Sequence, residues 1–244
     1  MNKSELTKLS INNIKFSEFK RIPKSNYYLS YLNSDEKLIF NTECIKLEKT
    51  GGGIQNIGKY CKSYNDQLKY GLRIPIYENS FIHEIEKRLE VLALENDLKL
   101  KLIDELNLKQ STIFKYKSVI VKSKNKKYTD TYKTSFNIKY VNDEKMIGTK
   151  FFKFKNLKKY VQENAKNDEY ELINVKKLDD LNKAFDYNSQ TDFIPQFLVK
   201  NVIIERVSSS LVIIKFKLEL QQILFQTNKK KYNKISDLPF LAKK

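Results

Sequence analysis

The chain has 244 residues and a formal net charge of +17 at pH 7, with 46 lysines and arginines against 29 acidic residues. This length allows one large domain or two small ones, each with a core of its own, so no disulfide or metal is needed for stability. The two cysteines, Cys44 and Cys61, are too few and too widely separated to predict a disulfide framework or a zinc site.

No segment of about 18 consecutive apolar residues is present, and the first residues lack the apolar core of a secretion signal. We therefore expect a soluble protein in a reducing, intracellular compartment, without membrane association. The sequence pI of about 9.5 indicates a polyanionic partner. Nucleic acid ranks ahead of an acidic membrane because no strongly amphipathic basic helix is visible.

Alternating apolar and polar residues predict strands over much of the first 80 residues. Residues 1–13 are polar and are expected to be flexible. Residues 27–32 and 38–47 flank a short polar turn and are predicted to pair as a hairpin. A further strand is predicted over residues 69–77, where Pro75 favours the edge of a sheet, because proline has no N–H to donate to a neighbouring strand.

The segment from Gly53 to Lys59 has the G-x-x-x-x-G-K spacing of a phosphate-binding loop. Tyr60 follows in place of the serine or threonine that would hold magnesium. Residues 61–66 also lack the apolar period of the helix whose N-terminus would receive the phosphate. We therefore interpret the segment as a glycine-rich turn between strands, which would place Lys59 near a nucleic-acid phosphate.

One clear helix is predicted after residue 80. Ser80 is a suitable N-cap, and apolar residues then recur at three- and four-residue spacing in two stripes, separated by a bend near Asn96. His83 is the only histidine and is predicted to be a surface residue, because no carboxylate or nucleophile can be paired with it for catalysis. The stripes comprise Ile82, Ile85, Leu89 and Leu92, and then Leu98, Leu102, Ile103 and Leu106.

The stretch from Ser111 to Tyr160 carries most of the excess charge. Its fifty residues contain fourteen lysines and three acidic residues, a net charge of +11, together with ten aromatic rings. Lysine attracts phosphate and planar rings accept unpaired bases, which is the combination that single-strand-binding proteins use. The other interpretation is that any strand-rich segment needs aromatic residues in its core and charges on its outer face.

Rings and lysines alternate at the period of a strand in residues 114–117, 132–140 and 151–155, which sends the two sets to opposite faces. A strongly curved sheet is expected to bring rings at its rim together with lysines on loops such as 122–127. Tyrosine is preferred for stacking because it tolerates partial exposure. The predicted phosphate contacts are Lys59, Arg73, Lys115, Lys117, Lys122, Lys124, Lys126, Lys127 and Lys133, and the predicted stacking residues are Tyr116, Tyr128, Tyr132 and Tyr140.

The most apolar part of the chain lies near its C-terminal end. Residues 197–207 and 211–220 are β-branched runs joined by three serines, and are predicted to form a buried hairpin. Phe225 is expected to end the folded part, so that residues 14–226 form one nucleic-acid-binding domain. Residues 227–244 are a basic tail with an apolar tip, predicted either to be loose or to contact replication proteins.

Several segments resemble the single-stranded-DNA-binding proteins of the nucleocytoplasmic large DNA viruses. The similarity lies in residues 14–28 and 39–47, the glycine turn at 51–53, the strand ending at Ile76 with its following helix, and the final hairpin. The resemblance spans roughly residues 11 to 226. It implies an α+β fold, in which a mostly antiparallel, oligonucleotide-binding (OB)-like β-barrel carries extra strands and one or two helices. It also implies a location in the host cytoplasm, at a viral replication factory, or in the virion.

The predicted function is sequence-independent binding and protection of single-stranded DNA during replication or repair. An RNA-binding or transcription-accessory subunit is the main alternative, because the same charges and rings would serve RNA. A nucleotidyltransferase or nuclease is less favoured, since metal-dependent phosphoryl chemistry needs closely held carboxylates and the sequence shows no such pair. We expect no enzymatic activity, catalytic residue, metal or cofactor, and self-association remains open.

Overall fold

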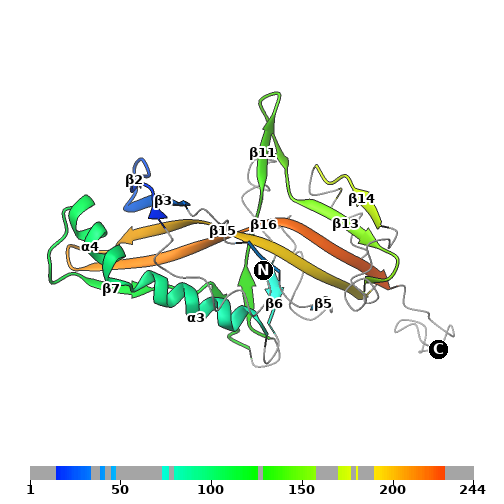
Figure 1. The fold of residues 1–244 in the computed structure, drawn as a ribbon, viewed down its shortest axis with the longest axis horizontal. Coiled ribbons are helices and arrows are strands. Elements are labelled where there is room, and N and C mark those ends of the chain that lie inside the picture. Colours follow the sequence, from blue (N-terminus) through cyan, green and yellow to red (C-terminus); the bar gives the residue numbers. More distant parts are fainter. Residues whose placement is uncertain are drawn as a thin grey trace, which may run out of the picture.

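Two long antiparallel strands form the centre of the fold. The computed structural model describes residues 15–33, 39–41, 45–47, 73–76, 80–125, 129–157, 170–176, 180 and 190–228. Among these, β15 (Gln190–Arg206) and β16 (Leu211–Asn228) pair along nearly their whole lengths on either side of Ser208–Ser210. They run across the molecule from one end to the other (Figure 1). The predicted C-terminal hairpin is therefore confirmed, and it is longer than the sequence indicated.

The other strands of the 11-stranded main sheet lie along the two edges of this hairpin. Strands on the β15 edge pair with it antiparallel, whereas those that contact the β16 edge directly are parallel to it, so the sheet is mixed. The β15 edge carries β3 (Tyr27–Asn33), β4 (Ile39–Asn41) and β5 (Ile45–Leu47), with β1 (Lys15–Phe16) and β2 (Lys20–Arg21) beyond β3. The β16 edge carries β7 (Ile113–Tyr116), β10 (Ser135–Phe136) and β13 (Lys150–Phe154), with β14 (Tyr170–Ile173) beyond β13.

The predicted pairing of residues 27–32 with residues 38–47 is wrong. β3, β4 and β5 all pair with β15, at residues 201–205, 196–198 and 191–193 respectively, and therefore lie end to end along one edge. The physical reason is that β15 offers a long row of backbone donors and acceptors, which satisfies three short segments in succession. These segments therefore pair with β15, far along the chain, and not with each other across the turn.

Two smaller sheets accompany the main one. In the three-stranded sheet β9 (Thr131–Lys133) lies between β6 (Arg73–Pro75) and β8 (Ile120–Val121) and pairs antiparallel with both, so Pro75 lies on an edge strand, as predicted. The second sheet is a hairpin formed by β11 (Ile138–Val141) and β12 (Glu144–Ile147).

The β11–β12 hairpin stands out from the main sheet as an arm (Figure 1). Asn142 and Asp143 at its tip have φ angles of 49° and 63°. Positive φ at both positions is typical of a two-residue type I′ turn, which these residue types tolerate. At the root, the Thr149 hydroxyl donates to the Leu220 carbonyl at 2.8 Å and accepts from the Asn137 N–H at 3.0 Å. The arm is therefore fastened directly to β16.

The fold class is α+β and mostly β-sheet, but the described strands do not close into the predicted OB-like barrel. Residues 132–140, expected to form one alternating strand, break at Thr134 and Asn137. Their three pieces, β9, β10 and β11, belong to three different sheets. The chain therefore changes sheet twice within these residues, which do not form one continuous strand of a closed barrel.

The two described helices follow the predicted periodicity. α3 (Ile82–Ala93) and α4 (Asn96–Glu105) are separated at Leu94 and Glu95, and of the predicted apolar stripes only Ile103 is not fully buried. The N-cap position is Phe81, one residue after the predicted Ser80. His83 is exposed in the first turn. Neither described helix is long and apolar enough to cross a membrane.

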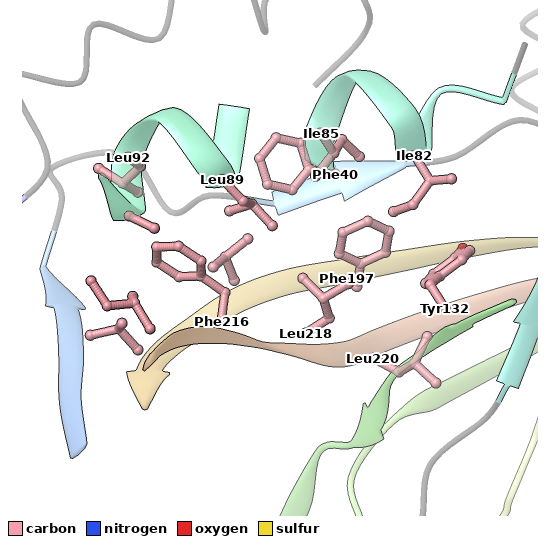
Figure 2. Packing of buried hydrophobic residues seen from close by; sticks show 14 of the residues in the cluster. Phe40, Ile82, Ile85, Leu89, Leu92, Tyr132, Phe197, Phe216, Leu218 and Leu220 are labelled. Atoms are coloured by element: carbon pink, nitrogen blue, oxygen red, sulfur yellow. The ribbon is translucent and has the colours of Figure 1, made fainter. Parts of the chain in front are cut away.

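The main core lies between α3 and one face of the central hairpin. Figure 2 shows Ile82, Ile85 and Leu89 of α3 above the aromatic rings of the sheet. The ring of Phe197 on β15 has its centroid 5.8 Å from that of Phe40 and 6.0 Å from that of Tyr132. The helix thus packs on part of one face of the β15–β16 hairpin and does not cover the opposite face (Figure 1).

Candidate nucleic-acid interface

The face of the main sheet opposite α3 is built from alternate residues of its strands. On β16, Ile214 and Phe216 are buried on the helix side, whereas Ile213, Lys215 and Lys217 are only half-buried. Successive side chains of a strand point to opposite faces, and directly paired residues of neighbouring strands share a face. The pairings of β16 therefore extend this set across the sheet, and we call the resulting surface the open face.

Three rows of directly paired residues make up the open face. Each row crosses β15 and β16, and the rows reach outward to β3, β2 or β7. Lys117 joins them at the end of β7, where its N–H donates to the Ile214 carbonyl at 2.8 Å. The first row is Tyr27, Glu205, Ile213 and Lys115; the second is Lys20, Leu29, Ile203 and Lys215; the third is Tyr31, Asn201 and Lys217.

The open face combines positive charge with accessible rings. Three of its five lysines are exposed and the other two are half-buried, while its single partly exposed carboxylate is Glu205. Tyr31 is 49% exposed, and Tyr27 is half-buried. The phenol of Tyr31 therefore presents an exposed planar surface on a sheet face that also carries five lysines.

Glu205 is held by two donors on the open face. The Tyr27 hydroxyl donates to Glu205 Oε1 at 3.2 Å, and the Lys215 ammonium donates to Glu205 Oε2. Lys215 Nζ also lies 5.1 Å from the centroid of the Tyr27 ring, a cation–π arrangement. The hydrogen bond from Lys215 lowers the pKa of Glu205, and the charges of Lys215 and Lys117 lower it further. The carboxylate is therefore ionised at neutral pH.

Of the predicted site residues, Lys115 and Lys117 lie on the open face, but Tyr116 between them points to the helix side. Its hydroxyl donates to Glu86 Oε2 at 3.0 Å, and its ring centroid is 6.3 Å from that of Phe216. Burial raises the pKa of Tyr116, and the nearby carboxylate of Glu86 raises it further. Tyr116 therefore attaches α3 to β7, and the prediction that it stacks on bases is not supported by its position.

The structure places Tyr132 in the core, although the sequence predicts it to be a stacking residue. Its side chain is 0% exposed and belongs to the main core, where it packs on Phe197, so no base can reach its ring (Figure 2). Tyr140, in contrast, is 69% exposed on the arm, with Lys145 Nζ 5.9 Å from its ring centroid. The same spacing of rings in the sequence thus produced one core residue and one surface residue.

The remaining predicted residues lie on other elements or outside the described part. Lys122 and Lys124 are exposed after β8, and Lys133 is exposed on β9. Arg73 is described only through its backbone, which pairs with Lys133. The described candidate residues are divided among the open face, the three-stranded sheet and the arm. They do not gather in the single groove that the sequence predicts. Lys59, Lys126, Lys127 and Tyr128, the glycine-rich turn at 53–59, Cys44, Cys61 and the tail beyond residue 228 all lie outside the described residues.

Compared with known proteins, the chain matches no family model and no curated protein sequence. The chemistry of the site must therefore be argued from its own side chains. Among the residues that the structure describes, no group of three or more His, Cys, Asp or Glu side chains is arranged to hold a metal ion. The groups on the open face are suited to binding a polyanion that carries planar rings.

Sequence reasoning missed five of the seven lysines and tyrosines of the open face, namely Lys20, Tyr27, Tyr31, Lys215 and Lys217. The signal was present in the alternation of Lys215-Phe-Lys217 and in the two tyrosines four residues apart on β3. The prediction of a buried hairpin does not use this signal, because it assigns both faces of the hairpin to the core. β16 instead buries only one of its two faces between residues 212 and 218.

Proposed function

We propose that the protein is a non-enzymatic binding protein for single-stranded nucleic acid, with single-stranded DNA as its principal ligand, and that the open face is the contact surface. The observation that carries the proposal is the presence of five lysines and two tyrosines on a sheet face that α3 does not cover. Lysines neutralise phosphates, and a tyrosine ring gives an unpaired base a surface on which to stack.

The choice of DNA over RNA draws on the resemblance of the sequence to viral single-stranded-DNA-binding proteins. Under the same proposal, the main sheet is an elaborated and opened form of an OB-like sheet, and the protein coats and protects DNA during replication or repair. RNA remains the alternative ligand, because rings and ammonium groups do not by themselves recognise the 2′-hydroxyl. Titration with matched deoxyribo- and ribo-oligonucleotides distinguishes the two ligands.

The lysines of the open face are expected to set the salt dependence of binding. In the double variant Lys115→Ala/Lys217→Ala, binding to oligo-dT should depend less on salt. The negative slope of log affinity against log salt should become shallower by about 0.7 for each phosphate that is no longer neutralised. Fluorescence anisotropy titrations at several salt concentrations measure this slope. The matched control is Lys87→Ala/Arg88→Ala, which removes two exposed charges from α3 and should leave the slope unchanged. Equal slopes for both double variants would place the contact surface elsewhere.

Tyr31 is expected to act on bases and not on the backbone. Tyr31→Ala should weaken binding to a base-bearing strand by about 1–3 kcal/mol and should have a much smaller effect on an abasic strand of equal charge. The comparison variant is Tyr140→Ala on the arm. If only Tyr140→Ala distinguishes the two strands, the stacking surface is the arm and the open face is not the site.

A further inference from the structure

Glu205 is an exception on the open face, because it is the only acid among the described residues that form the three rows of this face. Its side chain is 24% exposed. Among the described residues of β2, β3, β7, β15 and β16, the other acids are Asp192 and Glu219, which are only 3% and 4% exposed. A carboxylate at this position repels a phosphate backbone. On single-stranded DNA, which has no 2′-hydroxyl, the hydrogen-bond donors along the strand that Glu205 can contact are those of the bases.

Two hydrogen bonds orient the Glu205 carboxylate and leave acceptor positions for a base. Each of its oxygens already accepts one hydrogen bond, Oε1 from Tyr27 and Oε2 from Lys215, so the carboxylate is fixed in orientation. An ionised carboxylate has about four acceptor positions, which leaves each oxygen able to accept a further donor. Its two hydrogen-bond partners act as donors here, and its directly paired neighbour on β16, Ile213, carries no polar group.

We propose that Glu205 makes one position of the open face selective for guanine, an inference that rests on the single-strand-binding function proposed above. An unpaired base exposes its Watson–Crick edge to the protein. Guanine presents N1–H and an N2 amino hydrogen side by side, and these match the two oxygens of a carboxylate. Adenine and cytosine each place an acceptor nitrogen beside their amino group, and thymine flanks its N3–H with two carbonyl oxygens. Only guanine therefore offers two adjacent donors without an opposing acceptor.

Glu205 and the stacking residue Tyr31 lie at different positions of the open face. Tyr31 lies four residues from Tyr27 on β3, or about 13 Å along the strand, so the stacking surface and the carboxylate serve different nucleotides. The row that contains Lys20 and Lys215 lies between them. Phosphates can then contact lysines on either side of the base that Glu205 recognises. The preference belongs to one position of the site, which is compatible with binding to most sequences.

The inference is tested with two oligonucleotides that differ by one amino group. Repeats of d(GT) and d(IT) carry the same charge and the same N1–H, but inosine lacks the N2 amino group of guanine. The wild-type protein should bind d(GT) repeats about fivefold or more tightly than d(IT) repeats, because a matched bidentate contact gives at least this discrimination. Lithium chloride is used as the salt, since lithium disfavours four-stranded guanine structures.

Glu205→Gln is the decisive variant. It should reduce the d(GT) to d(IT) affinity ratio to near one, because the amide offers only one acceptor, and it should raise the affinity for oligo-dT by removing a negative charge. Equal affinities for the two repeats in the wild-type protein, or an unchanged ratio in Glu205→Gln, would overturn the inference. The wild-type comparison needs no variant to fold. If the protein binds oligo-dT with a steep salt dependence but does not discriminate the repeats, the inference alone fails. If no oligonucleotide binds, the proposed function fails with it.

Discussion

Tyr132→Ala is expected to lower the free energy of unfolding by about 3–5 kcal/mol, because it removes an aromatic ring from the centre of the core. Tyr132 is 0% exposed and is paired on β9 with Ile74 on one side and Ile120 on the other. Its ring packs on Phe197, so truncation opens a cavity at the junction of the main and three-stranded sheets. Urea denaturation followed by circular dichroism measures the loss.

Two controls separate a core role from a binding role for Tyr132. Tyr132→Phe keeps the ring and should retain most of the stability. Tyr31→Ala, on the open face, should change stability by no more than about 0.5 kcal/mol, as is usual for surface substitutions. If Tyr132→Ala kept its stability and instead lost affinity for base-bearing strands, the ring would be reaching the ligand and the packing described above would be wrong.

Lys200→Ala is expected to cost about 3 kcal/mol of stability, because it leaves a buried carboxylate without its counter-ion. Glu219 is 4% exposed, and its Oε2 accepts from Lys200 Nζ at 2.7 Å, while Oε1 accepts from Gln221 Nε2 at 3.1 Å. Lys200 lies at a register shift between Val199 and Asn201. At this bulge Lys200 has no directly paired residue on β16, and its side chain reaches Glu219.

The matched comparison is Lys215→Ala, which removes a lysine from the partly exposed pair with Glu205. The side chain of Glu205 is 24% exposed and keeps its hydrogen bond from Tyr27, so loss of Lys215 leaves no buried, unpaired charge and should cost about 1 kcal/mol or less. Adding Glu219→Gln to Lys200→Ala should recover much of the lost stability, since the buried charge is then gone. Equal effects of the two lysine variants in chemical denaturation would contradict the distinction between a buried carboxylate, Glu219, and a partly exposed one, Glu205.

The parts of the fold that depend on local periodicity could be predicted from the sequence. The stripes of α3 and α4 and the β-branched runs of β15 and β16 are signals within a few turns or one strand, and the structure confirms them. The pairing of β3 and β4 could not be predicted in the same way. Their partners lie in residues 196–205, far along the chain. No local sequence pattern indicates which distant strand a short strand will pair with.

The candidate site shows the same limit at the level of single residues. Alternation in β7 correctly separates Lys115 and Lys117 from Tyr116, but it does not tell which face α3 will cover. Continuity was assumed through Thr134 and Asn137, where the chain changes sheets, so Tyr132 and Tyr140 were wrongly placed on one surface. The open face joins three distant segments of the chain, and only their strand pairings bring Tyr31 and Lys217 into one row.

The dependence of both sheet edges on β15 and β16 also determines when the protein can fold. Strands β3, β4, β5, β7, β10 and β13 precede the hairpin in the chain, yet each of them pairs directly with β15 or β16. During synthesis these segments leave the ribosome before the strands that complete their hydrogen bonds exist. Such long-range pairing is slow, because the entropy cost of closing a large loop comes before the contacts that stabilise the closed loop can form. The nascent chain therefore carries unpaired strands until its C-terminal hairpin is made, and a chain interrupted before residue 190 lacks the template of its main sheet.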